Sequence, residues 1–543
     1  MKLATLFFQA GRHAVVRWAS YVPYTMAQRP THYPHQSVLL VGPSFAGSPL
    51  ALLAEALREA GWLAATSRMP SGQDEAFALC RGHGTIVLVP ETATVGHRGW
   101  VDTCTRGTYD LLCAACDTGG VVERVVVLST LDIFTAYPQA FKIGADWQPR
   151  PSTNPEQLGP HLMEFVAREF ARSSPLAVVI ARLGHLDDAT QRFWVSGEAA
   201  MLQLVDVITT RGPVDVIPSH HRPGKYRILH VKDPTCDVLP VGQKLDVVAA
   251  DAATAALADP RLDTLESTPA VVGKVLLLGA NGMLGPPVVN ALGDDFALTV
   301  TDVNPYGWRA GGDEIVAGAA NLVDLIKPLY NFHQPCKEEV VDIADADAVE
   351  KVSADVDATV NCAVLRPHPK LAFDVNTTGT YNAIRSAVAN GHSRFINTGP
   401  HHTVIGGLYE DYDYAISTDV PPHPGLDLYS LSKGCGQEIC RVFSENHPIH
   451  VLLCLFLNFK RTAETPTVGE GTNPHSITFT DAANIIRAAL TVDLTKMPSK
   501  CETFYCTSTL PHGRYSNRKT KALLGWEPED LLTSYYLKPE AKL

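Results

Sequence analysis

Two side chains of the segment Tyr429-Ser-Leu-Ser-Lys433 have the types and the spacing for proton transfer. If this segment is helical, residues four apart share one face, so the phenol and the ammonium stand side by side. The charge of Lys433 would then favour the phenolate and lower the pKa of Tyr429 toward a range useful for acid–base chemistry. Because a Tyr and a Lys four apart often form an ordinary surface pair, the interpretation depends on a second signal in the same region.

That second signal is a set of three glycines after an apolar run. The run Lys274–Leu278 leads directly into Gly279, Gly282 and Gly285, a spacing typical of the turn that binds a dinucleotide pyrophosphate. The first glycine would permit a sharp turn, the second a close approach of backbone to phosphate, and the third tight packing of the following helix. The free amides and the dipole of that helix favour an anion at its amino terminus. The residues expected to contact the cofactor here are Gly279, Asn281, Gly282, Met283, Leu284 and Gly285.

An acid follows at the distance expected for a nicotinamide dinucleotide. The next apolar run, Phe296–Asp302, ends about 20 residues after the glycines, where a carboxylate accepts hydrogen bonds from the adenosine ribose. This favours NAD over NADP, because Asp302 would repel a 2′-phosphate. The alternative is that Asp302 only caps the next turn.

In their order along the chain, these motifs resemble the extended short-chain dehydrogenase/reductase superfamily, in its NAD-dependent epimerase/dehydratase branch, from Gly273 to Pro528. The resemblance implies a doubly wound α/β fold in which Tyr429 transfers the proton while hydride passes between a substrate carbon and the nicotinamide. It also implies that Lys433 holds the nicotinamide ribose. Further positions that match the family are Asp342 and Ile343 beside the adenine, Asn361 and Ala363 beside the nicotinamide, Asn376 at the start of a helix below the site, and the segments 479–483 and 523–528.

The hydroxyl that the family places after its fifth strand is displaced in this chain. The strand-like run 394–397 is followed by Thr398-Gly-Pro-His-His-Thr403, whose Gly-Pro pair occupies the usual position. Thr398 or Thr403 would supply the hydroxyl from a shifted loop, or His401 or His402 would donate to the substrate instead. Two adjacent histidines in a loop are, however, more often a polar surface feature.

Length and composition restrict the class of protein. The chain has 543 residues, of which 45% are hydrophobic and 19% charged, and this predicts two sizeable globular cores. The formal charge of −12 argues against nucleic acid as a partner, and the sequence predicts no membrane-spanning helix. The 12 cysteines are scattered, and Cys113 and Cys116 have no second pair, so we expect reduced thiols and no metal site.

The first half of the chain repeats the second half in weakened form. Five segments match in the same order, which predicts a tandem duplication with a period of roughly 240–270 residues. The matching pairs are 37–47 and 274–282, 105–110 and 377–382, 123–129 and 393–398, 175–182 and 448–454, and 195–200 and 479–483.

The first half lacks the residues that carry the chemistry. Phe45 stands where the middle glycine would fall, the second strand ends in Arg68 rather than an acid, and no Tyr-x-x-x-Lys occurs before Phe165. We therefore expect a structural role for this half, with residual NADP binding at Arg68 as a minor alternative.

The resemblance also predicts how the halves meet. Members of the superfamily commonly dimerise by packing two helices of each subunit into a four-helix bundle. A tandem chain would bury the same faces internally as a pseudo-dimer. Helices beginning near Thr105 and His161 are then expected to pack on those beginning near Thr377 and Tyr429.

Four segments follow from these patterns. They are an extension at 1–36, a degenerate Rossmann-like domain at 37–245, a linker at 246–272 and an NAD-binding catalytic domain at 273–543. Residues 1–54 contain no acid but include Lys2, Arg12, Arg17 and Arg29, a balance that resembles an organellar transit peptide. A true start at Met26 is an alternative, and we favour a cytoplasmic location.

The sequence thus predicts an NAD-dependent oxidoreductase or epimerase/dehydratase-like enzyme with one working site, in the second half. By resemblance, its substrate is a nucleotide-sugar or a related small molecule that carries a hydroxyl. The insert 408–414 and the loop 460–474 are expected to line the substrate, with Lys460 and Arg461 near its diphosphate. The alternative is a catalytically silent sensor or scaffold protein that binds NAD.

Overall fold

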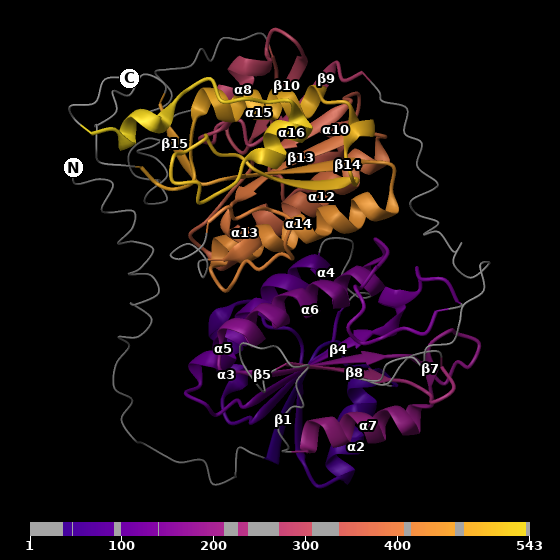
Figure 1. Ribbon diagram of the computed structural model, residues 1–543. Coiled ribbons are helices and arrows are strands. Elements are labelled where there is room, and N and C mark those ends of the chain that lie inside the picture. The colour runs from indigo at the N-terminus through magenta and orange to yellow at the C-terminus, as the bar shows by residue number, and fades with distance from the viewer. Residues whose placement is uncertain are drawn as a thin grey trace, which may run out of the picture.

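The computed structural model contains two parallel β-sheets, one in each half of the chain, with helices on both faces of each sheet (Figure 1). Nearly all of the extension and of the linker, the insert before Tyr414 and most of the loop 460–474 lie outside the residues that the structure describes. The described residues are 36–45, 47–91, 99–139, 141–210, 226–236, 271–306, 336–406, 414–461 and 472–538.

The first sheet has six strands in the order β2-β1-β3-β4-β5-β8. Its central strands are short runs of aliphatic and β-branched residues that are buried on both faces, as expected for a parallel sheet covered by helices. The strands are β1 (Ser37–Val41), β2 (Leu63–Ser67), β3 (Thr85–Leu88), β4 (Arg124–Thr130), β5 (Ala177–Leu183) and β8 (Tyr226–Val231), with a small pair β6 (His185–Leu186) and β7 (Trp194–Val195). The helices are α2 (Pro49–Glu59), α3 (Gln73–Cys80), α4 (Gly99–Asp102), α5 (Thr108–Asp117), α6 (Pro155–Ser173) and α7 (Gly197–Thr209), with a π-helical turn η3 (Thr103–Gly107) and a 3₁₀ turn η4 (Leu131–Phe134).

The second sheet has seven strands in the order β11-β10-β9-β12-β13-β14-β17. The strands are β9 (Lys274–Leu278), β10 (Ala297–Asp302), β11 (Lys337–Val340), β12 (Ala358–Asn361), β13 (Arg394–Pro400), β14 (His450–Phe456) and β17 (Cys501–Tyr505), with a small pair β15 (Asn458–Lys460) and β16 (Ser476–Thr478). The helices are α8 (Gly285–Leu292), α10 (Ala346–Ser353), α11 (Pro369–Phe373), α12 (Thr380–Ala389), α13 (His402–Ile405), α14 (Leu428–Asn446), α15 (Phe479–Thr491) and α16 (Arg518–Leu524), with turns η7 (Asp374–Gly379), η8 (Leu494–Lys496) and η9 (Leu532–Tyr536).

The predicted fold class of two doubly wound, Rossmann-like parallel sheets is confirmed. Counted along the chain, the strand order of the second half is 3-2-1-4-5-6-7, and the first half has the same order without strand 3. The chain from Ser67 to Thr85 contains only α3, so a counterpart of β11 has no room there. Each half also has a π-helical turn at the corresponding place, η3 before α5 and η7 before α12.

Strand β13 is longer than the sequence predicts. It continues past Asn397 to Pro400, because Thr398, Gly399 and Pro400 stay in parallel register with Cys454, Leu455 and Phe456 of β14. The expected loop between Thr398 and the histidines is therefore sheet up to Pro400.

The two halves pack against each other through the predicted segments around Thr105, His161, Thr377 and Tyr429, and also through α4, which the sequence did not predict. Figure 1 shows α4 and α6 of the first half next to α14 of the second, between the two sheets, and α6 and η3 contact α14 while α4 contacts η7. Helices α2 and α7 cover the outer face of the first sheet, and α8 and α15 cover the outer face of the second. The interface thus uses the inner helices of both halves.

The interface is an apolar core shared by the halves. The main apolar cluster on the inner face of the first sheet includes Phe373, Leu431 and Cys435 from the second half. The inner cluster of the second half in turn includes Trp100 and Leu162 from the first. Trp100 lies edge-on to Tyr381 with ring centres 5.3 Å apart. Within the described ranges, no helix combines the length and the apolar character needed to cross a membrane.

Candidate active site

Helix α14 presents the Tyr–Lys pair at its first two turns. Asp427 caps this helix by accepting hydrogen bonds from the backbone N–H of Ser430 at 2.9 Å and from its hydroxyl at 3.0 Å. Tyr429 is half-buried, whereas Lys433 is 1% exposed and donates from Nζ to the carbonyl oxygen of Ala363 at 2.7 Å. The two side chains therefore start on one face of the helix, and the lysine reaches the loop after β12.

The electrostatics of this pair differ from the expectation. Burial raises the pKa of Tyr429, and the Arg366 guanidinium, 4.5 Å from the ring centre, partly offsets that rise. Burial also lowers the pKa of Lys433 to about 8. The cation that stabilises the Tyr429 phenolate is thus Arg366, because Lys433 points its ammonium at Ala363. Arg366 was missed from the sequence, where its only signal is a basic residue shortly after the strand that ends at Asn361.

The glycine turn after β9 packs directly on the same loop. Gly279 has φ +80°, and a Cβ there would lie 2.5 Å from the backbone nitrogen of Ala363. A Cβ on Gly285 would lie 2.1 Å from the carbonyl oxygen of Ala280, so both positions require glycine. At Gly282 a Cβ would meet, among the described residues, only the carbonyl oxygen of Gly279, at 3.2 Å, so these residues leave the outer side of the turn open.

The turn fits a pyrophosphate with one change from the expectation. Pro286 and Pro287 open helix α8, and neither has an N–H to donate. An anion here would be held by the amides of the turn and of Gly285, the first residue of the helix, because the next two residues have no N–H. Met283 and Leu284 lie in this stretch, and Leu284 precedes the helix as its N-cap.

Asp302 lies at the carboxyl end of β10, beside the turn. One oxygen accepts the backbone N–H of Asn281 at 3.0 Å, and the other accepts that of Val303 at 2.9 Å. The carboxylate therefore braces the glycine turn and also caps its own strand end. Because each carboxylate oxygen can accept more than one hydrogen bond, this bracing is compatible with binding a ribose hydroxyl.

Asp342 and Ile343 follow β11 at the same edge of the sheet. Asp342 is exposed and accepts the backbone N–H of Ala344 at 2.9 Å. Ile343 is buried against Gly379, where a Cβ would lie 2.6 Å from its side chain. Asn382 donates to the carbonyl of Ile343 at 3.1 Å and so fixes this corner to α12.

Two buried asparagines shape the loop after β12. Asn361 accepts the backbone N–H of Ala363 at 3.1 Å and donates to Asn397 Oδ1 at 3.0 Å. Asn376, in η7, donates to the carbonyl of Leu365 at 2.7 Å and to Ser432 Oγ of α14 at 3.0 Å. These side chains tie the loop to the sheet and to the Tyr–Lys helix.

The two candidate hydroxyls both donate to main-chain carbonyls. Thr398 Oγ1 donates to the carbonyl of Asn361 at 3.0 Å, and Thr403 Oγ1 donates to that of Pro400 at 3.0 Å. Thr398 therefore belongs to the cluster around Asn361, whereas Thr403 lies on α13, which packs on α14. Each hydroxyl oxygen keeps lone pairs with which it can accept a hydrogen bond.

Of the two adjacent histidines, His401 is buried and His402 is half-buried, so the pair is not simply a surface feature. His401 is fully buried, and its ring centre lies 3.8 Å from that of His402, 4.8 Å from that of His475 and 5.2 Å from that of Tyr515. Tyr505 completes the cluster against His475 and Tyr515. The sequence did not reveal this cluster, because strands and loops far apart in the chain bring its members together.

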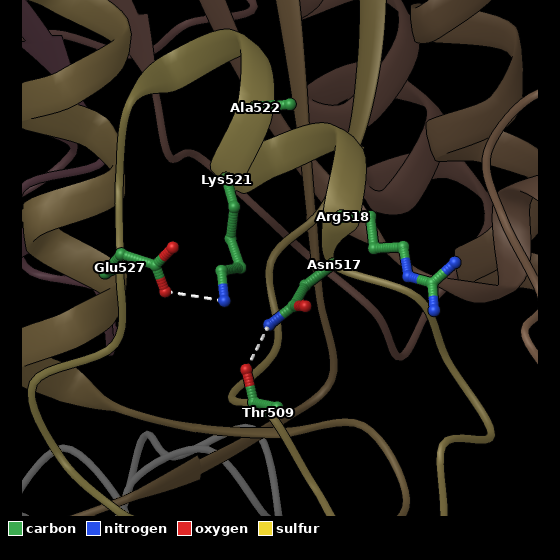
Figure 2. A pocket seen from close by; sticks show the side chains of 6 residues that line it. All are labelled: Thr509, Asn517, Arg518, Lys521, Ala522 and Glu527. Carbon is green, nitrogen blue, oxygen red and sulfur yellow. Dashed lines mark hydrogen bonds and ion pairs between the residues drawn. The ribbon is translucent and has the colours of Figure 1, made fainter.

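The cavity in Figure 2 lies beside α16, among residues that belong to none of these groups. It measures about 420 Å³. Its polar side chains pair with one another: Lys521 meets Glu527 at 2.6 Å, and Asn517 donates to Thr509 at 3.2 Å, while Arg518 points away. The lining residues are Thr509, Asn517, Arg518, Lys521, Ala522 and Glu527.

The corresponding place in the first half holds a closed ionic cluster. Ser129, Arg182 and His230 lie side by side on β4, β5 and β8, and Glu164 of α6 accepts from Arg182 at 3.0 and 2.7 Å. Burial lowers the pKa of His230 to about 3, so it is neutral near neutral pH. Phe134 packs its ring against both Arg182 and His230. At the first-half turn, Phe45 is 59% exposed.

The family comparison agrees with this geometry. Residues 275–466 match the model of the NAD dependent epimerase/dehydratase family. The second half contains an epimerase/dehydratase-family domain. This match begins in β9 and includes the glycine turn, Asp302, the loop at Asn361 and the Tyr–Lys helix.

Several solved structures are similar to about half of this chain. One is a uronate dehydrogenase from Agrobacterium tumefaciens, 22% identical over 48% of this chain and 86% of that one, with a TM-score of 0.37. A second is a UDP-glucuronic acid 4-epimerase from Bacillus cereus in complex with NAD, 16% identical over 49% and 97%, with a TM-score of 0.37. A third is a UDP-glucose 4-epimerase from Thermotoga maritima with UDP-glucose, 13% identical over 49% and 96%, with a TM-score of 0.35. A search of curated proteins found no match.

Proposed function

We propose that the second half is an NAD-dependent oxidoreductase or epimerase/dehydratase-like enzyme, with the single working site of the chain. One observation carries the proposal. The loop from Asn361 to Ala363 packs against the glycine turn at Gly279, and its Ala363 carbonyl oxygen accepts a hydrogen bond from the ammonium of Lys433. The dinucleotide turn and the proposed proton-transfer helix therefore meet at one point of the sheet's carboxyl edge, where ligands of such sheets bind.

In this proposal, NAD supplies the hydride acceptor when it is bound. The turn from Gly279 to Gly285 would hold the pyrophosphate, Asp302 the adenosine ribose, and Asp342 with Ile343 the adenine. Lys433 would hold the nicotinamide ribose, beside Ala363.

Tyr429 would take the proton of the substrate hydroxyl at its phenolic oxygen. Because burial raises the pKa of this phenol, the nearby Arg366 guanidinium would make proton transfer easier by stabilising the phenolate. The hydroxyl of Thr398 donates to the carbonyl of Asn361, at the start of the cofactor loop, and we infer that it or Thr403 orients the reacting oxygen. The buried histidine cluster at His401 stands at the end of β13 as a further source of donors.

We infer that the substrate is a nucleotide-sugar or a related hydroxyl-bearing small molecule, the class common in the matching family. Lys460, whose Nζ lies 5.0 Å from the ring centre of Tyr535, is a candidate contact for its diphosphate. We further infer that the halves arose by tandem duplication, with domains at 37–245 and 273–543. The strand order, which is the same in both halves apart from the missing third strand of the first, and the paired π-helical turns support this inference.

Calorimetry with NAD⁺, NADH and NADP⁺ on the full chain tests the proposal. We expect one site that prefers NAD(H), and a weaker preference in Asp302→Ala. Turnover is then measured on uronates and UDP-sugars with wild type and Tyr429→Phe, and the variant should lose at least about 100-fold in rate. Binding without turnover by wild type on the whole panel would instead favour a silent NAD sensor.

A further inference from the structure

The segment 421–427, which we term the lead-in loop, delivers the chain into helix α14 two residues before Tyr429. It contains Gly425 with φ +72° and ends at the capping residue Asp427. The position of Tyr429 therefore depends on where this loop is held.

A carboxylate of the first half holds the lead-in loop. Glu169, on α6, is fully buried, and its Oε2 accepts the Nδ1–H of His423 at 2.5 Å and the backbone N–H of Gly425 at 3.1 Å. Its Oε1 accepts a hydrogen bond from Arg172 of its own helix at 2.7 Å. One carboxylate oxygen of Glu169 thus accepts a hydrogen bond from the first half, and the other accepts two from the second half.

The same loop is joined to the second candidate catalytic segment. The backbone N–H of His423 lies 3.2 Å from the carbonyl oxygen of Thr403 and 2.9 Å from that of Val404, on α13. Gly406, at the end of α13, packs so closely that a Cβ would lie 3.1 Å from the carbonyl oxygen of His423. His423 therefore connects Glu169 to the segment that carries the candidate hydroxyl of Thr403.

The free-energy cost of burying the Glu169 carboxylate is offset in large part by hydrogen bonds from the second half of the chain. A buried carboxylate requires pairing, and two of the donors to Glu169 belong to the lead-in loop. Burial alone would raise the pKa of Glu169, but the hydrogen bond from His423 and the charge of Arg172 outweigh it and keep the pKa below the usual value. Glu169 is therefore an ionised acceptor near neutral pH.

We propose that Glu169 of the first half is a positioning residue for the site of the second half, because its carboxylate fixes the lead-in loop that places Tyr429 and Thr403. The inference rests on the proposed function for its catalytic consequence. The first half would then be part of the working site through α6, although its own strand ends are closed by the Arg182 cluster.

Hydrogen exchange on the full chain, with and without NADH, tests the positioning directly. In Glu169→Ala, amides of the lead-in loop should exchange at least about tenfold faster than in wild type, since a hydrogen bond to a charged group is lost. In Glu169→Gln, which keeps one acceptor oxygen, the increase should be smaller. His423→Gln tests the loop side without altering α6. The side chains of Arg172 and Arg168 are 40% and 35% exposed, so water can solvate them when Glu169 is removed.

The matched control is His161→Gln on the same helix. His161 pairs across the same interface with Glu438 of α14 at 2.6 Å, but Glu438 lies about two and a half turns past Tyr429, and its carboxylate also accepts from Arg441 of its own helix at 2.7 Å. This variant should leave exchange of the lead-in loop within about twofold of wild type. Where wild type turns over a panel substrate, Glu169→Ala should lower kcat by about tenfold and leave the affinity for NADH unchanged.

Two results separate the inferences. Unchanged exchange of the lead-in loop in Glu169→Ala, or an equal change in His161→Gln, would overturn the positioning role whatever the activity. Faster loop exchange together with NADH binding but no turnover by wild type would uphold the positioning contact and refute the proposed enzyme.

Discussion

Burial makes the phenol of Tyr429 a weaker acid, and the nearby guanidinium of Arg366 partly restores its acidity. Since Arg366 favours the phenolate, its removal should raise the pKa of Tyr429 further. In Arg366→Ala, we expect the rising limb of the pH–rate profile to move to higher pH, by up to about one unit for a partly exposed charge. Arg366→Lys should retain most of the wild-type profile. Identical profiles for all three proteins would show that Arg366 has no part in proton transfer.

The buried ammonium of Lys433 should lower the free energy of unfolding of the protein. Its pKa of about 8 in the folded chain is below the usual 10.5, so the folded state binds fewer protons than the unfolded state between these values. This contribution to stability therefore rises with pH above 8. We expect Lys433→Met to be more stable than wild type near pH 7, on the order of 1–3 kcal/mol, with a gap that narrows as pH rises through 8. Denaturant unfolding at several pH values measures the gap, and a pH-independent loss of stability in the variant would contradict this.

Residue types and spacing were enough to propose Tyr429, Lys433 and the glycines as site residues, because the chemistry expected of them depends on local geometry along one segment. The partners of these residues were not predictable in the same way. Arg366 comes from another loop, and the histidine cluster joins residues 401 and 475 across separate strands. The lead-in contact from Glu169 crosses 254 positions of sequence.

At the scale of elements, the turn between β9 and α8 is the most constrained piece of backbone in the proposed cofactor site. In Gly285→Ala, the added methyl would lie 2.1 Å from a carbonyl oxygen, so turn and helix must separate. We expect the affinity for NADH to fall by at least about tenfold and the free energy of unfolding to fall by about 1–3 kcal/mol. Gly273→Ala, where a Cβ would lie at an ordinary contact distance of 3.6 Å from Asp357 Oδ2, is the control and should change neither quantity. Fluorescence titration with NADH and thermal unfolding provide both numbers.

The sequence predicted the parallel sheets because their strands are continuous apolar runs between turn residues. It ended β13 too early, since Gly399 and Pro400 are poor strand formers, and pairing with β14 overrides that preference. The π-helical turns at η3 and η7 had no signal of their own, although the similar segments around Gly107 and Gly379 marked the places where they occur.

At the scale of the whole molecule, the two halves are expected to unfold as one unit. Trp100 is 1% exposed and packs within the second half's inner cluster, so Trp100→Ala should cost about 3–5 kcal/mol and destabilise both halves together. Leu53→Ala, in the outer cluster of the first half, is the comparison. Denaturant unfolding followed by hydrogen exchange in each half checks this, and separate transitions for the halves in wild type would count against a shared core.

The pseudo-dimer arrangement was predicted from five ordered matches between the halves, together with the four-helix-bundle dimers that are common in the superfamily that the chain resembles. The polar contacts of the interface did not follow, because they depend on side chains that differ between the halves. His161 and Glu169 face Glu438 and His423, and the sequence offers no motif that pairs them.

Because the core is shared by both halves, the first half cannot complete its packing until the second half has been synthesised. About 255 residues separate the end of α6 from the start of α14, and at about 5–20 residues per second the ribosome needs roughly 13–50 s to make them. Throughout that interval the apolar face of α6 has left the ribosome before its partner exists. Nascent chains of this protein should therefore be clients of holding chaperones until α14 is translated, and slow codons between the halves should lower the yield of folded protein.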